Sequence, residues 1–271
     1  MSKTILITGA SSGIGKATAR HFHAMGWNVI ATMRHPEREE ELTSLENTLV
    51  TRLDVLDSAS IDQAVASGIE RFGWIDALLN NAGYGAYGPL EAFDMDSIRR
   101  QFDTNVIGLL AVTKAVLPHM RATRSGTIVN ISSIGGKMTF PLGTLYHGTK
   151  FAVEGLSEAL HYELEAIGVK MKIIEPGMIR TDFGGRSFDF RNDESMVEYQ
   201  PTVKCLFAAF GSSVTQASAP EVVADAIYIA VTDGSNQLRY TAGEDARQLM
   251  ANRKAQDDDR FIGGLKAQMD L

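Results

Sequence analysis

Tyr146 and Lys150 are two residues whose types and spacing could support proton transfer. They stand four positions apart, so both lie on one helix face if Tyr146 already belongs to the first helical turn. A phenol has an ordinary pKa of about 10 and exchanges a proton near neutral pH only if something stabilises the phenolate. The Lys150 ammonium could do this. The pair therefore indicates an acid/base centre, although the same spacing also arises by chance on helix surfaces.

A glycine-rich turn near the start of the chain could hold a dinucleotide phosphate. The segment Thr8-Gly9-Ala10-Ser11-Ser12-Gly13-Ile14-Gly15 follows an apolar run and precedes a helical pattern. Glycines permit a tight turn and a close approach of the backbone to a pyrophosphate, and the N-terminus of a helix attracts its charge. A turn of this kind could simply connect two elements without binding anything, but its position between a strand and a helix favours a dinucleotide site.

The end of the second predicted strand indicates which dinucleotide is bound. An NAD site usually has an acid there, about 20 residues after the glycine turn, which binds the ribose 2′-hydroxyl. This strand ends instead in Met33-Arg34. A guanidinium is a charged donor fork suited to a 2′-phosphate, so we expect NADP(H), with Ser11 or Ser12 and His35 as further contacts. The alternative is that Arg34 is a solvated surface charge.

Polar and small residues also stand at the ends of three later strands. Asp54-Val55 ends the third predicted strand, where Asp54 could accept the adenine amino group or cap the next helix. Asn81-Ala82-Gly83 follows the fourth, where small residues let the backbone lie close to a cofactor. Pro176-Gly177-Met178-Ile179-Arg180-Thr181 follows the sixth and could, on its residues alone, be only a turn.

Short apolar runs that alternate with helical patterns predict the fold class. The expected strands are Thr4–Thr8, Asn28–Thr32, Val50–Val55, Ala77–Asn80, Thr127–Ile131 and Lys170–Glu175, and the expected helices are Gly15–Met25, Ser58–Phe72, Ser97–Met120 and Lys150–Ile167. This alternation predicts an α/β protein with a Rossmann-type, doubly wound parallel sheet, which binds ligands at the carboxyl ends of its strands. The motifs above all stand at those ends.

The length and composition suggest one domain. A chain of 271 residues with 44% hydrophobic content can bury one substantial core, so we expect a single domain over residues 1–271. The regular alternation fails over about 181–220. Because this segment is rich in aromatic residues, we interpret it as a substrate lid rather than a disordered excursion. Residues from about 240 to 271 form a C-terminal extension.

The charge and cysteine content exclude some partners. A net charge of −7 gives no electrostatic reason to expect a nucleic acid or an anionic membrane, and no metal site is predicted. One cysteine, Cys205, cannot form an internal disulfide, and the first apolar run is too short for a signal or membrane segment. We therefore expect a soluble cytoplasmic protein with a small-molecule substrate.

Taken together, the motifs resemble those of the classical short-chain dehydrogenase/reductase family. They stand in the family's order over about residues 4 to 182. The matching positions are Thr8, Gly9, Gly13 and Gly15; Asp54; Asn80-Asn81-Ala82-Gly83; Asn105; Ser133; Tyr146 and Lys150; and Pro176-Gly177.

The resemblance implies a role for each matching residue. Ser133 and Tyr146 would bind the substrate oxygen, and Lys150 would bind the nicotinamide ribose and depress the tyrosine pKa. Asn105 would help to hold a water in the proton relay. Ser133 is preferred to Ser132 because its interval to Tyr146 resembles that of the family.

The resemblance also extends to the cofactor and the assembly. The backbone of the segment 176–181 would meet the nicotinamide carboxamide, with Thr181 on the phosphate side. The protein would be an NADP(H)-dependent oxidoreductase, near hydroxysteroid and retinol dehydrogenases, that interconverts a carbonyl and an alcohol. A homo-oligomer, dimer or tetramer, is expected, with a dimer formed through the helices Ser97–Met120 and Lys150–Ile167. The C-terminal sequence lacks the glycine-rich ending common in the family, which argues against four subunits.

Other features leave alternatives open. A nucleotide-sugar epimerase or dehydratase would use a similar Tyr and Lys, and a regulator could sense NADP(H) without catalysis. His147 follows the tyrosine where many family members have a small residue, and we interpret it as packing or pocket shape. The segments 136–145 and 183–199, with Phe207 and Phe210, suggest a pocket for an apolar ketone or alcohol, but the same aromatic residues could belong to the core.

Overall fold

The structure is a computed structural model that describes residues 2–181, 185, 187–214, 217–269 and 271. Its centre is a seven-stranded sheet in the order β3-β2-β1-β4-β6-β7-β9, in which every pairing is parallel. The strands are β1 (Thr4–Thr8), β2 (Asn28–Met33), β3 (Thr48–Arg52), β4 (Ala77–Asn80), β6 (Thr127–Ile131), β7 (Lys170–Pro176) and β9 (Arg239–Ala242). The predicted doubly wound α/β fold is confirmed.

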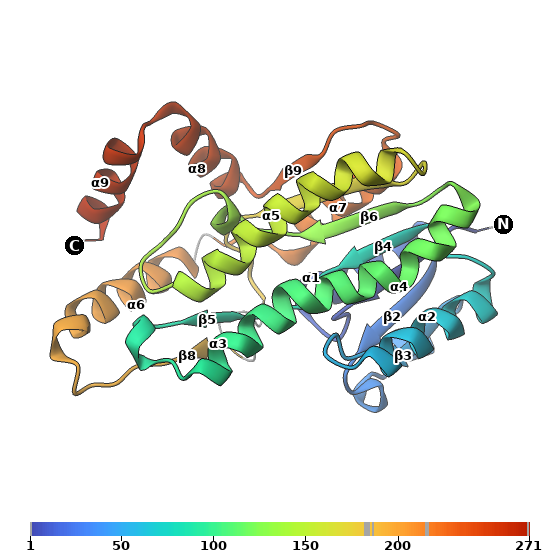
Figure 1. Ribbon diagram of the computed structural model, residues 1–271, viewed down its shortest axis with the longest axis horizontal. Helices are drawn as coiled ribbons and strands as arrows, with labels where there is room; N and C mark the ends of the chain where they lie inside the picture. The colour runs from blue at the N-terminus through green and yellow to red at the C-terminus, as the bar shows by residue number, and fades with distance from the viewer. Residues whose placement is uncertain (1, 182–184, 186, 215–216, 270) are drawn as a thin grey trace.

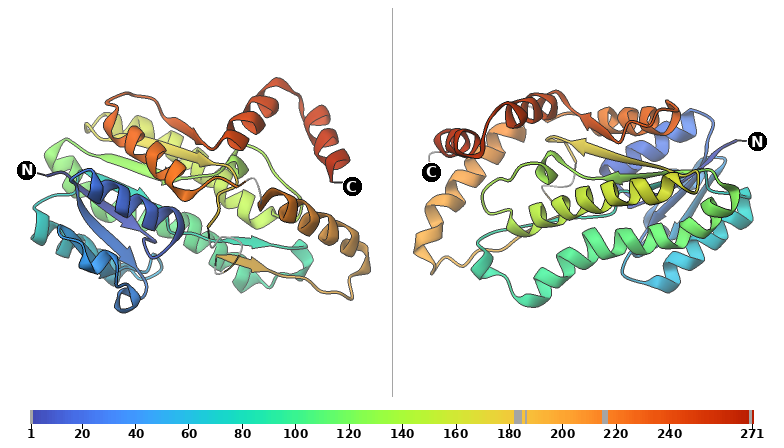
Figure 2. Two further views of the ribbon diagram at one scale, coloured as in Figure 1. Left: turned by 180° about the vertical axis from the view of Figure 1, so that it is seen from behind. Right: turned by 45° about the horizontal axis from the view of Figure 1, so that its top comes forward.

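Helices cover both faces of the sheet (Figure 1). Successive side chains of a strand point to opposite faces, and β1 shows this: Ile5 and Ile7 pack with one core cluster and Leu6 with the other. The first cluster includes residues of α1 (Gly13–Ala24) and α7 (Pro220–Thr232), which lie together behind the sheet (Figure 2). The second includes α2 (Ser58–Phe72), α4 (Gly108–Thr123) and α5 (Thr144–Glu165).

Two strands of the central sheet differ from the sequence prediction by more than one residue. The third strand is Thr48–Arg52 rather than Val50–Val55, because its pairing with β2 runs from Val29–Thr48 to Met33–Arg52 and stops where β2 ends. Asp54 and Val55 therefore lie in the connection to α2. The strand β9 was not predicted, because its four residues alternate in burial and resemble an edge strand. It pairs with β7 and belongs to the central sheet, whose last residue in sequence is Ala242.

Two predicted helices differ more strongly, whereas α1 spans Gly13–Ala24 in place of the predicted Gly15–Met25. The segment Ser97–Met120 is not one regular helix: α3 (Met95–Phe102) passes into a π-helical turn, Asp103–Ile107, before α4 begins. Such a turn is frequent at functional sites. The helix α5 begins at Thr144, earlier than the predicted Lys150. Tyr146 therefore lies in the first helical turn, and the condition for placing it on the Lys150 face is met.

Residues 187–214 form structure outside the central sheet. A short strand, β8 (Phe188–Phe190), pairs with β5 (Gly85–Tyr87), and α6 (Gln200–Val214) follows. The last helices, α8 (Glu244–Ala255) and α9 (Asp258–Gln268), extend from β9 at the corner opposite the N-terminus (Figures 1 and 2). Phe261 of α9 packs with Ile134 and Met138. Within the described residues, no helix is long and apolar enough to cross a membrane.

The close packing of α1 against the glycine turn generates a prediction. A Cβ on Gly15 would lie 2.3 Å from the Gly9 carbonyl oxygen, which belongs to backbone and cannot rotate away. Gly15→Ala should therefore lower the free energy of unfolding by about 1–3 kcal/mol, the usual effect of overpacking. Chemical denaturation followed by circular dichroism measures this change.

The matched control is Gly263→Ala, at an exposed helical glycine of α9 where a Cβ would meet nothing within 4 Å. It should stabilise the protein by about 0.5–1 kcal/mol, because alanine favours helix over glycine. Equal stability of the two variants would contradict the packing argument.

Candidate active site

The end of β6 and the first turn of α5 bring the predicted catalytic side chains together. Ser133 is the N-cap of a short 3-10 helix, and its Oγ accepts a hydrogen bond from the Gly135 N–H at 3.0 Å. The Tyr146 side chain is hydrogen-bonded to Ser133. Two hydroxyl groups from distant sequence positions therefore meet at one point at the carboxyl edge of the sheet.

Lys150 lies one helical turn after Tyr146, as its spacing predicted. Its Nζ donates a hydrogen bond to the Ile131 carbonyl oxygen at 2.8 Å and lies 5.7 Å from the centre of the Tyr146 ring. Burial lowers the pKa of Lys150 to about 8, because an ammonium loses hydration there. The last residue of β6 thus holds the lysine in place. Because the pKa is about 8, the charged form of Lys150 predominates only moderately near neutral pH.

The pKa of Tyr146 differs from the expectation. We predicted that Lys150 would depress it, whereas burial raises it to about 12. The hydrogen bond from Ser133 acts in the opposite direction but is the smaller effect. The reason is that removing a phenolate from water costs more than one neutral hydrogen bond returns. The tyrosine is therefore protonated near neutral pH in this structure.

Asn105 is buried in the π-helical turn and braces the loop that follows β4. Its Nδ2 donates to the Tyr84 carbonyl oxygen at 2.8 Å and to Thr149 Oγ1 at 3.1 Å, while its Oδ1 accepts from the Tyr84 N–H at 3.1 Å. A Cβ on Gly83 would lie 3.0 Å from Asn105 Oδ1. The side chain thus joins the 83–84 loop to α5, and its role in a water relay stays a prediction.

The glycine turn has the geometry of a phosphate cradle. Gly9 and Gly13 have φ values of +69° and +53°, which side chains rarely adopt. Ser12 is the N-cap of α1 but makes no capping hydrogen bond with its side chain. The first N–H groups of the helix are therefore not capped from within and can bind an anion. These residues fit a dinucleotide pyrophosphate.

The residues directly after β4 hold this cradle through hydrogen bonds. The Nδ2 of Asn81 donates to the carbonyl oxygens of Thr8 at 2.9 Å and Gly9 at 3.1 Å. In return, Thr8 Oγ1 accepts the N–H groups of Asn81 and Ala82 at 2.9 and 3.0 Å. The Asn81 side chain therefore holds the turn rather than projecting from it. The predicted approach of the Asn81-Ala82-Gly83 backbone to a cofactor stays a prediction.

The end of the segment 176–181 lies against the same turn. Thr181 side-chain atoms would lie 3.2 Å from a Cβ on Gly13, so the end of this segment faces the cradle. A pocket of about 410 Å³ opens there, lined by Ser11, Ser12, Gly13, Lys16, Ala17, Arg20, Arg180, Thr181, Pro220 and Glu221. Pro176, Gly177 and Ile179 lie earlier in the segment, and their predicted cofactor contacts stay predictions.

Asp245 is a residue that the sequence analysis missed. Its Oδ2 accepts the Met178 N–H at 2.6 Å, and a Cβ on Gly177 would lie 2.3 Å from the same oxygen. Asp245 belongs to α8 and is far from the motif in sequence. The C-terminal extension therefore holds the segment predicted to meet the nicotinamide, and no sequence signal pointed to this contact.

Arg34, directly after β2, is a cation that is exposed to solvent. Arg34 is exposed and makes no hydrogen bond or ion pair with any described residue. Lys16 and Arg20, by contrast, are paired with Glu39 and Glu41: Lys16 Nζ lies 2.9 Å from Glu39, and Arg20 lies 2.5 Å from Glu41. Of these three cations, Arg34 is the one that has no carboxylate partner in the described part of the chain.

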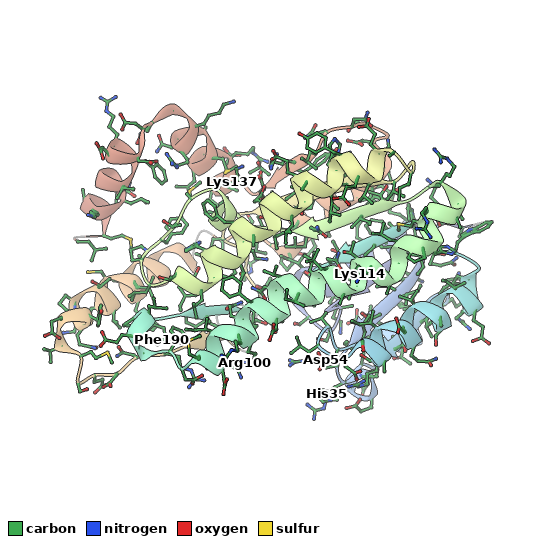
Figure 3. The ribbon with its side chains drawn as sticks, in the orientation of Figure 1. His35, Asp54, Arg100, Lys114, Lys137 and Phe190 are labelled. Atoms are coloured by element: carbon green, nitrogen blue, oxygen red, sulfur yellow. The ribbon has the colours of Figure 1, made fainter. Side chains whose placement is uncertain are left out.

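Asp54 lies near the end of β2, because β3, which Asp54 follows, pairs with β2 (Figure 3). Its Oδ1 accepts the Leu56 N–H at 3.0 Å in the turn after β3. The alternative that Asp54 caps α2 is wrong, since the capping residue is Asp57, which accepts the Ser60 N–H. Val55 packs against Gly108 at the start of α4. His35 is exposed, with Nδ1 at 3.2 Å from Glu37.

His147 fastens the loop between Ser133 and α5. Its Nδ1 donates to the Gly135 carbonyl oxygen at 2.9 Å and its Nε2 accepts the Phe140 N–H at 3.0 Å, which assigns the neutral tautomer. Burial lowers its pKa. His147 is therefore a packing residue that sets the shape of the 135–140 loop.

An apolar cluster surrounds Tyr146. It contains Tyr87, Leu142, Phe188, Phe190 and Leu206, from β5, the loop before α5, β8 and α6. The ring centres of Tyr87 and Tyr146 are 5.5 Å apart, and Phe190 meets Phe207 edge-on at 4.8 Å. Phe183 and the Phe210 side chain, also predicted as pocket wall, lie outside the described residues.

Comparison with known proteins identifies relatives over most of the chain. Residues 3–192 match the short chain dehydrogenase family. An uncharacterized oxidoreductase of Schizosaccharomyces pombe is 45% identical over 239 residues, which is 88% of this chain and 100% of the relative. Human retinol dehydrogenase 8 is 39% identical over 68% of this chain and 61% of its own length.

Solved structures agree with this assignment. A short-chain dehydrogenase from Streptomyces avermitilis superposes with a TM-score of 0.81 at 34% identity, over 97% of both chains. The protein ElxO with NADP bound gives a TM-score of 0.76 at 28% identity, over 92% of this chain and 100% of its own. Neither the epimerase nor the non-catalytic sensor is supported by these relatives. The chain belongs to the short-chain dehydrogenase/reductase family and is an oxidoreductase.

Proposed function

We propose that this enzyme interconverts an apolar ketone or aldehyde and the corresponding alcohol with NADP(H), using Ser133, Tyr146 and Lys150. The observation that carries the proposal is the hydrogen-bonded Ser133 and Tyr146 pair beside Lys150, at the same sheet edge as the glycine turn. The nicotinamide supplies or accepts the hydride when it is bound. Human retinol dehydrogenase 8 is a relative that acts, by its name, on such an alcohol.

The protein side of the reduction follows from the protonation states. Tyr146, whose pKa is raised to about 12, holds its proton near neutral pH and donates it to the carbonyl oxygen as that oxygen gains charge. The Ser133 hydroxyl donates a second hydrogen bond to the same oxygen. The Lys150 ammonium stabilises the phenolate that remains, because the two groups share one helix face. Asn105 keeps the 83–84 loop against α5.

The apolar cluster around Tyr146 supports an apolar substrate. Tyr87, Phe188 and Leu206 offer hydrocarbon and ring faces beside the tyrosine, and such surface binds apolar groups with few specific polar contacts. Segment 181–220, which provides two of these residues, serves as a substrate lid on a single domain that spans residues 1–271. The enzyme works in the cytoplasm, a setting compatible with its single cysteine.

The test of catalysis is Tyr146→Phe with NADPH and a panel of steroid, retinoid and aryl carbonyl compounds. Loss of the proton donor should reduce kcat/KM by about 10²–10⁴-fold, because the phenyl ring keeps the packing but not the hydroxyl. Tyr228→Phe is the control, since Tyr228 is on α7 and packs with the core cluster on the other face of the sheet. Equal turnover by the parent and Tyr146→Phe would refute the assignment.

Cofactor preference is tested at Arg34. We expect the parent to favour NADPH over NADH, as the exposed Arg34 guanidinium can pair with the 2′-phosphate, and Arg34→Ala to lose about 10- to 100-fold of that preference, the effect of about 1.5–3 kcal/mol for a charged hydrogen bond. The dissociation constants of both cofactors are measured by fluorescence. Arg38→Ala, at an arginine that is paired with Glu37, is the control. A preference that survives Arg34→Ala removes the residue from this role.

We also infer a homo-oligomer, dimer or tetramer, built on α4 and α5. Large apolar side chains are exposed on this face: Phe102, Ile107, Phe151 and Tyr162. Phe151 and Tyr162 belong to α5, whereas Phe102 and Ile107 lie just before α4. Exposed apolar groups gathered on neighbouring helices are typical of a protein interface.

The assembly is tested by light scattering after size exclusion. The parent should elute as a dimer or tetramer and Phe151→Glu as a smaller species, because a buried carboxylate in the interface lacks a partner. Ile229→Glu, at a 53% exposed position of α7 on the other face, should leave the mass unchanged. A monomeric parent would contradict this inference.

A further inference from the structure

A buried group of charges lies behind the catalytic lysine, and the reaction described above does not use it. It consists of Glu154 of α5, Glu175 of β7 and Arg239 of β9, which we call the Glu154 cluster. Glu154 is 5% exposed and Glu175 is 1% exposed. Two carboxylates removed from water in this way are costly to the fold unless they are paired or do something further.

Arg239 pairs with these carboxylates only in part. Its Nε donates to Glu154 Oε2 at 2.9 Å and lies 3.7 Å from Glu175 Oε1, and its Nη2 binds Glu158 Oε2, on the exposed side. Thr241 Oγ1 donates to Glu175 Oε2 at 3.2 Å. Both Glu154 Oε1 and Glu175 Oε1 are buried and have no hydrogen-bond partner among the described residues. The single positive charge of Arg239 is therefore shared among the carboxylates of Glu154, Glu158 and Glu175, and the group keeps a net negative charge.

The geometry directs this charge towards Lys150. Glu154 follows Lys150 by four residues on α5, so both side chains lie on one face of the helix. A Cβ on Gly136, in the loop after Ser133, would lie 2.9 Å from the Lys150 carbonyl oxygen and 3.0 Å from Glu154 Cγ. Glu154 is thus packed directly beneath the catalytic loop rather than at a distant surface.

The electrostatics agree with this placement. Burial lowers the pKa of Lys150, and the charge of Glu154 acts in the opposite direction. The pKa of Glu175 is raised to about 6 by burial and by Glu154, so Glu175 is mostly ionised near neutral pH. The charged groups facing Glu154 and Glu175 are Lys150 and Glu158 on α5, Lys137 before it, and Arg239 on β9.

We propose that Glu154 is a positioning residue for the reaction: its partly paired carboxylate keeps the Lys150 side chain charged, and Arg239 sets how much of that negative charge reaches the lysine. The proposal rests on the role of Lys150 given above. It predicts effects of opposite sign at two positions. Removal of the Glu154 charge makes the ammonium easier to deprotonate, whereas removal of the Arg239 charge makes it harder.

The first measurement needs neither cofactor nor substrate. Lysines labelled with ¹³C at the ε carbon are titrated by NMR, and the Lys150 resonance is assigned by its loss in Lys150→Arg. In the parent, the pKa of Lys150 should be about 8. It should fall by about one pH unit in Glu154→Gln and rise in Arg239→Gln. A loosened structure alone would move both variants in the same direction.

Glu158→Gln is the matched control. Glu158 lies on the same helix and binds the same arginine, but its side chain is 51% exposed, so solvent screens its charge. Its removal should leave the Lys150 titration within about 0.3 pH unit of the parent. An unchanged titration in Glu154→Gln, or a fall in Arg239→Gln, overturns the proposal.

The second measurement is the pH profile of kcat for carbonyl reduction. In Glu154→Gln the alkaline limb should move to lower pH by the same amount as the NMR titration, because activity requires the charged lysine. A parent that reduces no carbonyl contradicts the proposed function and leaves the NMR test intact. An active parent whose Lys150 titration does not depend on Glu154 overturns this inference alone.

Discussion

The contact between the glycine turn and the end of β4 is the constraint on which the site depends. Asn81 bonds the carbonyl oxygens of Thr8 and Gly9, and Thr8 Oγ1 receives two N–H groups in return. This exchange occurs between β1 and β4, where the strand order of the sheet reverses. An open parallel sheet leaves a crevice at such a point, and the exchange holds the start of α1 beside it.

Burial is the second constraint, and it acts against the chemistry. It raises the pKa of Tyr146 to about 12 and lowers that of Lys150 to about 8, so both groups are driven towards their neutral forms. An acid/base tyrosine and a charged lysine therefore need surroundings that oppose desolvation. The Ser133 hydrogen bond does so for Tyr146, and the carboxylate of Glu154 does so for Lys150. The pKa values in the active site thus result from two opposed effects: burial disfavours the charged forms, and neighbouring groups stabilise them.

Much of the fold could be predicted because its signals are local. Buried parallel strands are continuous apolar runs, and five of the six expected strands agree with the structure to within one residue. The third strand was shifted because Leu53 is apolar and buried although the pairing with β2 ends at Arg52. The π-helical turn at Asn105 was missed because the residue types there give no local signal for it; in the structure its Asn105 is hydrogen-bonded to Tyr84, far from it in sequence.

The sequence by itself determined the fold class, the family and the residues of the glycine turn and the Tyr146 and Lys150 pair, because each depends on spacing within one element or on the order of short motifs. Only the tertiary structure decided which groups surround them. Asp245, Glu175 and Arg239 reach the site from strands and helices far along the chain, and no periodicity records such contacts. The pKa of Tyr146 was likewise decided by tertiary structure, since desolvation is a property of the packed interior.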